Sequence, residues 1–157
     1  MPELLTALLS AIIGYFVAIQ VERSKLKNRL RLENEYQILM RLWEKGYWVK
    51  SSANNLRPEH GPQAATLEEK QERLDDFAKK KEEFVKEMYL KKPFYPQVFH
   101  EVLEELKLET HMEAFDYNLS DPSEGAKYWD KASQNAETIN GIVDRLCSAI
   151  RHHINHG

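Results

Sequence analysis

The sequence has a single cysteine, Cys147, among 157 residues. One cysteine cannot form an intrachain disulfide, and a reducing compartment is its natural setting. A glycine-rich phosphate loop, a Gly-x-Ser-x-Gly nucleophile elbow and a cysteine cluster for zinc are also missing from the sequence. No familiar motif of nucleotide, acyl-transfer or zinc chemistry is therefore present, and we expect neither a metal nor a cofactor.

The sequence also lacks a strong excess of either charge. Lysine and arginine number 22 against 25 aspartate and glutamate residues, for a net charge of −3, and charged residues make up 30% of the chain. This composition describes a surface-rich soluble body rather than a polytopic membrane protein or a highly basic nucleic-acid binder. No alternating β pattern, internal repeat or low-complexity segment appears, so the sequence predicts an all-α fold.

One long uncharged run stands out against this charged background. Residues 4–21 read LLTALLSAIIGYFVAIQV. An 18-residue helix is roughly 27 Å long, close to the thickness of the hydrocarbon core of a bilayer. We therefore predict a transmembrane helix over residues 1–22 and a cytosolic helical bundle over residues 23–157. A buried core helix of a soluble protein is the alternative, because the run is at the short end of the range.

The charges around this run predict its orientation. No Lys or Arg precedes it, and no small-x-small cleavage site follows it, so it differs from a cleaved signal peptide. The positive-inside rule then places the N-terminus outside a bacterial inner membrane and the C-terminal domain in the cytoplasm. The basic residues that follow the run are expected to contact lipid headgroups, although a nucleic-acid role is possible. They are Arg23, Lys25, Lys27, Arg29 and Arg31.

One face of the predicted span is small and weakly polar. At about 100° per residue, Thr6, Ser10 and Gln20 share a sector of about 120°. Gly14 and Ala18 continue a small-residue spacing of four that lets helices approach closely in lipid, so this face favours self-association. If several copies form a ring, the same sector lines a lumen. The predicted lumen residues are Thr6, Ser10, Ile13, Val17 and Gln20.

Beyond the span, the sequence predicts four helical segments. The first continues from Val21 to about Asn54, relaxed at Gly46, and a loop follows to Ala65. Thr66 and Glu69 form a capping box for the second, which ends at Lys92–Pro93. Its predicted buried stripe is Leu67, Leu74, Phe77, Phe84 and Met88.

The third segment opens at Pro96, in position N1, and is markedly acidic. Phe99, Val102, Leu103 and Leu106 predict its buried side. A shifted apolar stripe then predicts a bend or break near Leu108, and consists of Leu108, Met112, Phe115 and Leu119.

The fourth segment has a cap at Asp121, Pro122 and Glu124 and a heptad of apolar residues. A heptad of this length indicates either antiparallel packing within a bundle or a seam between protomers. The heptad comprises Trp129, Ala132, Ala136, Ile139, Val143, Leu146, Ile150 and His153.

The end of the chain gathers imidazole and guanidinium groups. Arg145, Arg151, His152, His153 and His156 fall within twelve residues. Cations near a helix C-terminus interact favourably with the helix dipole, which is the simplest explanation. His152 and His156 also have the i,i+4 spacing of metal ligands, but no third ligand is evident.

Arg151-His152-x-x-x-His156 also matches the R-[N/H/D]-x-x-x-H signature of HEPN-type ribonucleases. With its N-terminal span, basic segment and helical body, the whole chain resembles the small membrane accessory proteins of type VI-B CRISPR systems, which carry a divergent HEPN-like motif. In active HEPN enzymes, two protomers face each other and no metal is required. The resemblance then implies that Arg151 holds an RNA phosphate and His156, with His152 nearby, handles the proton of a 2′-hydroxyl. Here His156 is the penultimate residue, which departs from the usual setting.

The resemblance implies a homo-oligomeric inner-membrane pore that enhances RNA-guided antiphage defence by permeabilising the membrane. Its expected partners are further copies of the chain, the lipid bilayer, and RNA or an RNA-guided nuclease. A membrane-tethered HEPN-type ribonuclease is one alternative. A non-enzymatic single-span scaffold, whose heptad seam recruits a partner, is the other.

Overall fold

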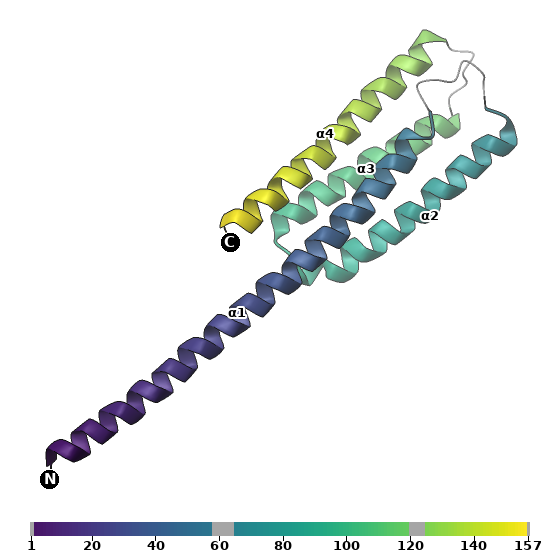
Figure 1. Ribbon diagram of the computed structural model, residues 1–157. Helices are drawn as coiled ribbons and strands as arrows, with labels where there is room; N and C mark the ends of the chain where they lie inside the picture. Colours follow the sequence, from purple (N-terminus) through teal and green to yellow (C-terminus); the bar gives the residue numbers. More distant parts are fainter. Residues whose placement is uncertain (1, 58–64, 120–124, 157) are drawn as a thin grey trace. The chain divides into compact units, whose positions relative to one another are not determined.

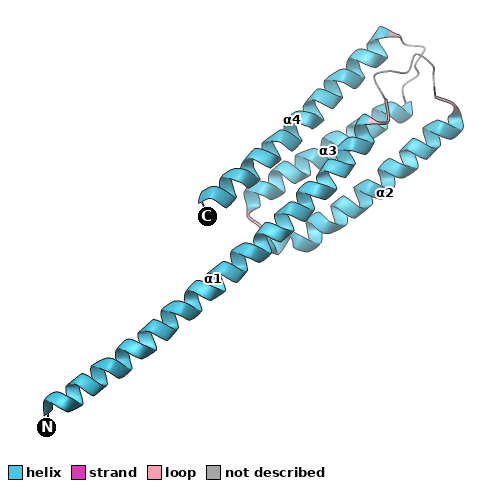
Figure 2. Ribbon diagram, in the orientation of Figure 1, coloured by secondary structure: helices cyan, strands magenta, loops and turns pink. Residues whose placement is uncertain are grey.

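The computed structural model describes the backbone of residues 2–57, 65–119 and 125–156, and the side chains of residues 13–57, 65–119 and 125–155. These residues are almost entirely helical, with no strand among them (Figures 1 and 2). The all-α prediction is confirmed. The helices are α1 (Pro2–Asn54), α2 (Leu67–Lys91), the 3₁₀ helix η1 (Lys92–Phe94), α3 (Gln97–Leu119) and α4 (Ala126–His156).

The chain divides into two units, residues 1–36 and 37–157. In the first unit, side chains 13–36 project from α1 and are almost all exposed. Within the stretches whose side chains are described, no helix has the length and apolar character needed to cross a membrane. Residues 4–12 of the predicted span lie outside those stretches. The second, compact helical unit begins at Gln37.

The core of the second unit is built from all four α-helices. Gly46 allows a close approach, because a Cβ atom at this position would lie 3.1 Å from Cδ2 of Leu106. The glycine therefore serves packing between α1 and α3 rather than a relaxation of the helix, and α1 is unbroken there. The largest fully buried apolar side chains are Leu39, Leu42, Val49, Leu56, Phe84, Met88, Phe99, Leu103, Leu106, Ile139, Ile142 and Leu146.

The predicted starts and ends of the helices are largely confirmed. The Thr66 side chain accepts a hydrogen bond from the backbone N–H of Glu69, and the Glu69 carboxylate accepts one from the backbone N–H of Thr66. α2 ends at Lys91, next to the predicted stop. Pro96 lies just before α3 rather than at its first position, and its carbonyl accepts the N–H of Phe99. The predicted cap at residues 121–124 lies outside the described residues.

The heptad of α4 packs inside the bundle. Ala132, Ile139, Val143, Leu146 and Ile150 are buried, and all but Ala132 belong to the common core. Of the two alternatives that the heptad left open, packing within the protein is the one observed. The seam is therefore already covered and is not a free surface for a partner.

The predicted stripes of α2 and α3 need correction. Leu67 begins α2 but is 87% exposed, because it precedes the part of the helix that meets the core. α3 runs through Leu108 without a break. The residues expected to continue its buried side are exposed, and Thr110, Glu113, Ala114 and Tyr117 are buried in their place. The exposed residues are Leu108, Met112, Phe115 and Leu119.

Candidate functional site

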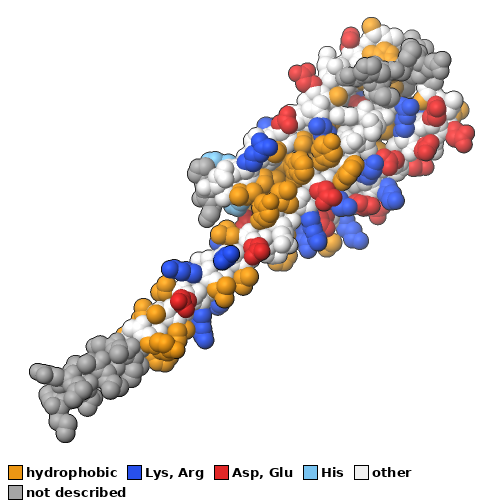
Figure 3. Space-filling view, in the orientation of Figure 1, with side chains coloured by type: hydrophobic (Ala, Val, Ile, Leu, Met, Phe, Trp, Pro, Cys, Tyr) orange, Lys and Arg blue, Asp and Glu red, His pale blue; other side chains and the backbone are white. Residues whose placement is uncertain are grey.

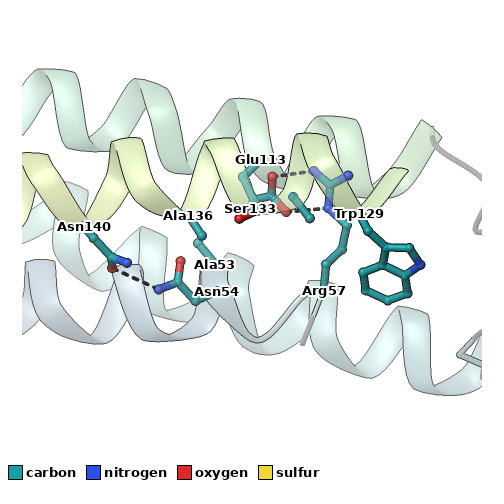
Figure 4. Close-up of a pocket in the computed structure, with 9 residues that line it drawn as sticks. Ala53, Asn54, Arg57, Glu113, Trp129, Ser133, Ala136 and Asn140 are labelled. Atoms are coloured by element: carbon teal, nitrogen blue, oxygen red, sulfur yellow. Dashed lines mark hydrogen bonds and ion pairs between the residues drawn. The ribbon is translucent and has the colours of Figure 1, made fainter. Parts of the chain in front are cut away.

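A pocket of about 410 Å³ lies between the end of α1, α3 and α4 (Figure 4). Small side chains leave this space open, because α1 contributes Ala53 and α4 contributes Ala132 and Ala136. Its volume falls within the range of small-molecule sites, roughly 300–1,000 Å³. The other lining residues are Asn54, Arg57, Glu113, Trp129, Ser133 and Asn140.

A buried ion pair forms one wall of this pocket. Arg57 Nε donates to Glu113 Oε1 at 2.7 Å, and Arg57 Nη2 donates to Glu113 Oε2 at 2.5 Å. The two side chains are only 1% and 4% exposed. Such a bidentate ion pair offsets the desolvation cost of both charges only when their remaining polar atoms also form hydrogen bonds.

The surrounding residues supply those further bonds. Asn135 Nδ2 donates to Glu113 Oε2 at 2.6 Å, and the Arg57 guanidinium lies 5.0 Å from the centre of the Tyr128 ring. Arg57 Nη1 also points to the backbone carbonyl of Tyr128, 3.5 Å away. Both carboxylate oxygens of Glu113 are thus occupied, so this group is not available as a general base. The network instead joins the end of α1 to α3 and α4.

The opposite end of the pocket is spanned by two amides. Asn54 Nδ2 donates to Asn140 Oδ1 at 3.2 Å, which links α1 to α4 (Figure 4). Asn54 Oδ1 is buried and has no hydrogen-bond partner among the described residues. Since Arg57 and Glu113 neutralise each other, the walls present polar groups without a net charge.

The Arg and His residues predicted at the C-terminus lie elsewhere, on the last turns of α4. Arg151 and His152 are exposed. His153 is half-buried and lies edge-on to Phe99, with ring centres 5.4 Å apart. Arg145 Nη2 forms an ion pair with Glu105 Oε1 at 2.5 Å. The side chain of His156 lies outside the described residues, so of the predicted motif the structure describes only the side chains of Arg151 and His152.

No cluster of three potential metal-ligating side chains occurs in the part of the chain that the structure describes. The buried ion pair holds only one carboxylate, Glu113, with Asp116 nearby through Asn135. Asp116 is itself paired with Lys131 at 2.8 Å. Arg57 therefore neutralises Glu113, and Lys131 neutralises Asp116.

The predicted membrane residues are placed as follows. Ile13, Val17 and Gln20 are exposed on α1, and a Cβ atom at Gly14 would meet nothing within 4 Å. Ala18 is exposed, as are the basic residues Arg23, Lys25, Lys27, Arg29 and Arg31. The side chains of Thr6 and Ser10 lie outside the described residues.

A second buried polar cluster surrounds His100, which the sequence did not single out. The Tyr95 hydroxyl donates to the Met88 carbonyl at 2.9 Å, so its oxygen accepts from His100 Nδ1, 3.2 Å away. His100 Nε2 then faces Glu104 Oε1 at 3.6 Å. Burial lowers the pKa of His100, and it raises the pKa of Tyr95 to about 12. Both groups are therefore favoured in their neutral forms at physiological pH.

The ion pair between Arg57 and Glu113 was missed, although the sequence holds a signal for one partner. Phe99, Leu103 and Leu106 set a helical spacing of four and three, and its continuation reaches Thr110, Glu113 and Tyr117. The apolar residues at 108–119 lie on a different face of the helix, so hydrophobicity alone predicts the wrong buried side there. Arg57 lies just after α1 and carries no comparable periodic signal.

Comparison with family models, with curated proteins and with solved structures finds no match for this chain.

Proposed function

We propose that the protein is a homo-oligomeric inner-membrane pore that acts in RNA-guided antiphage defence. In this proposal, residues 4–21 anchor each copy in the bilayer and the bundle of residues 37–157 lies in the cytoplasm. The link to defence comes from the resemblance to the type VI-B accessory proteins. The membrane role is supported by the sequence and by the exposure of the side chains in the first unit.

The observation that carries the proposal is the exposure of large apolar side chains around α1. Ile13, Tyr15, Phe16, Val17 and Val21 are each 46–67% exposed in the first unit. At about 100° per residue, they surround the helix with no gap wider than about 120°. A helix that is apolar all round needs cover on every side, whereas an amphipathic helix needs it on one. Lipid on some sides and other copies on the rest supply that cover.

A pore further needs a side of the helix that faces water. Gln20 shares a sector with Gly14, Ile13 and Val17, and Gly14 has open space around it. In a ring of copies, Ile13 and Val17 would narrow the lumen with branched apolar side chains. Such a constriction closes to ions by dewetting.

The test is a comparison of leak in cells that express matched variants of the full chain. Ile13→Ser and Val17→Ser should wet the constriction and depolarise the membrane on induction, as read by a potential-sensitive dye. Phe16→Ser lies outside the sector and serves as the control, since it weakens insertion without wetting the lumen. Equal depolarisation by all three variants, or by none, would rule out the pore.

The exposed guanidinium and imidazole groups of Arg151 and His152 favour a second candidate, the membrane-tethered ribonuclease. A purified chain would then cut single-stranded RNA without metal. The double variant Arg151→Ala and His156→Ala should abolish that cleavage. Persistent cleavage in the double variant would mark a contaminating nuclease and dismiss this candidate.

A further inference from the structure

The outer face of α1 in the second unit carries an aromatic cluster. Tyr47 and Trp48 are 43% and 46% exposed, and their ring centres are 5.8 Å apart. Trp43 stacks on Tyr47, also at 5.8 Å, and Met40 lies exposed one turn earlier. Figure 3 shows hydrophobic side chains gathered on one side of the bundle, with lysines and arginines beside them. Tryptophan and tyrosine are enriched among residues that dominate binding energy at interfaces.

The outer face of α3 carries a second apolar row. Leu108, Met112, Phe115 and Leu119 follow a spacing of four, three and four, and are 44–67% exposed. In the second unit, α3 lies behind α1 in Figure 1, and the inner sides of the two helices meet at Gly46 and Leu106. At about 100° per residue, each exposed face lies on the side of its helix away from this contact. The two faces therefore point away from each other. The chain therefore presents two apolar faces that its own fold does not cover.

Packing inside the bundle fixes which residues of the two helices are level. Gly46 lies against Leu106, and further along both helices Arg57 meets Glu113. α1 and α3 thus run in the same direction, and a residue of α1 is level with the residue about 60 positions later. Trp48 is then level with Leu108.

The same offset of about 60 positions places cations of α1 at the height of carboxylates of α3. Arg41 is level with Glu101, and Lys50 is level with Glu109. None of these four side chains has an ion-pair partner among the described residues. The carboxylates that border the α3 row elsewhere are already neutralised, Glu105 by Arg145 and Asp116 by Lys131. In two parallel copies placed side by side, the cations of α1 are therefore at the height of unpaired carboxylates on α3.

We propose that the outer face of α1 in one copy packs against the outer face of α3 in the next copy. The contact uses two different surfaces, so each copy offers one of each and the contact repeats until a ring closes. This inference rests on the proposed assembly of several copies, and adds the surfaces through which their bundles meet. The complementary charges set the partner as a second copy of this chain.

The test is cysteine cross-linking of the full chain in detergent, in a Cys147→Ser background. Ser51→Cys marks the α1 face, and Met112→Cys marks the α3 face at nearly the same level. Under mild oxidation, a mixture of the two single-cysteine chains should yield covalent dimers, and a chain with both cysteines should yield a ladder. Leu67→Cys, on a fully exposed position of α2, replaces Ser51→Cys as the matched control and should yield none.

Two results would overturn the inference. Dimers from Met112→Cys alone at the yield of the mixture would mean that α3 packs against α3. A mixture that gives no more dimer than the Leu67→Cys control would mean that the two faces do not meet.

Charge reversal provides an independent check of the pairing. Arg41→Glu should lower the cross-linking yield by about two- to fivefold, the range for an exposed ion pair. Combining it with Glu101→Arg on the other copy should restore the yield. If the second change lowers the yield further, these two residues are not paired.

The mass of the detergent particle separates this inference from the proposed function. A particle of several chains without the cross-link removes the inference and leaves the pore. A particle of one chain removes both. The expected cross-link in a particle that passes no ions supports the interface and removes the pore.

Discussion

Along the core face that contains Phe99, Leu103 and Leu106, the two halves of α3 bury different kinds of side chain. In the first half, Phe99, Leu103 and Leu106 enter the core, as their apolar spacing predicts. In the second half, Thr110 and Glu113 are buried while Leu108 and Phe115 face outward. The same helical face continues through both halves, and in the second half Glu113 on that face pairs with Arg57. Because Arg57 reaches the interior of the bundle from the end of α1, Glu113 must be on the buried side of α3 to pair with it.

This contrast shows that contacts along the whole length of a helix determine which of its faces is buried. A short apolar stripe of the right spacing can belong to an outer face. A buried charge at a core position then indicates an ion pair with a distant part of the chain.

The largest expected effect is from breaking the ion pair in the second half. Glu113→Ala leaves the Arg57 guanidinium buried without a carboxylate, which should lower the free energy of unfolding by about 3–5 kcal/mol. Urea unfolding of the full chain measures the change. Glu101→Ala, exposed on the same helix, is the control and should change stability by less than about 0.5 kcal/mol. Similar values for the two variants would contradict the buried pair.

Two leucines of α3 test the difference between its halves directly. Leu103→Ala, in the buried first half, should cost about 2–5 kcal/mol because it leaves a cavity. Leu108→Ala, in the exposed row, should cost less than about 1 kcal/mol in the monomeric bundle. Thermal unfolding at low protein concentration compares them. Equal losses would show that α3 buries its apolar row after all.

The smallest expected effect concerns the buried imidazole of the first half. Burial and nearby Lys92 lower the pKa of His100 in the folded chain, so the unfolded chain binds its proton first as the pH falls. Stability should therefore decrease below about pH 6.5, with a slope of at most about 1.4 kcal/mol per pH unit from this group. Urea midpoints between neutral and mildly acidic pH measure it.

His100→Asn removes the titrating group while keeping a nitrogen donor toward Tyr95. Its midpoints should fall less steeply with acid than those of the unchanged chain. Identical slopes would assign the pH dependence to other groups.

Much of the fold could be predicted from local rules, and the site could not. The capping box at Thr66, the stop at Lys92–Pro93 and the heptad of α4 depend on neighbours in sequence. The structure of these features can therefore be predicted from short segments of sequence. The pocket depends on Arg57 and Glu113 meeting across 56 positions, and on the absence of bulk at Ala53 and Ala136. Charged residues are usually exposed, so sequence rules place such a pair on the surface.

The most direct test of the pore is an electrical recording from the purified full chain in a planar bilayer. The unchanged protein should give discrete current steps, and Val17→Ser should give more frequent or larger steps than Phe16→Ser. A chain that inserts into the bilayer but passes no current, with Val17→Ser equally silent, would contradict the pore.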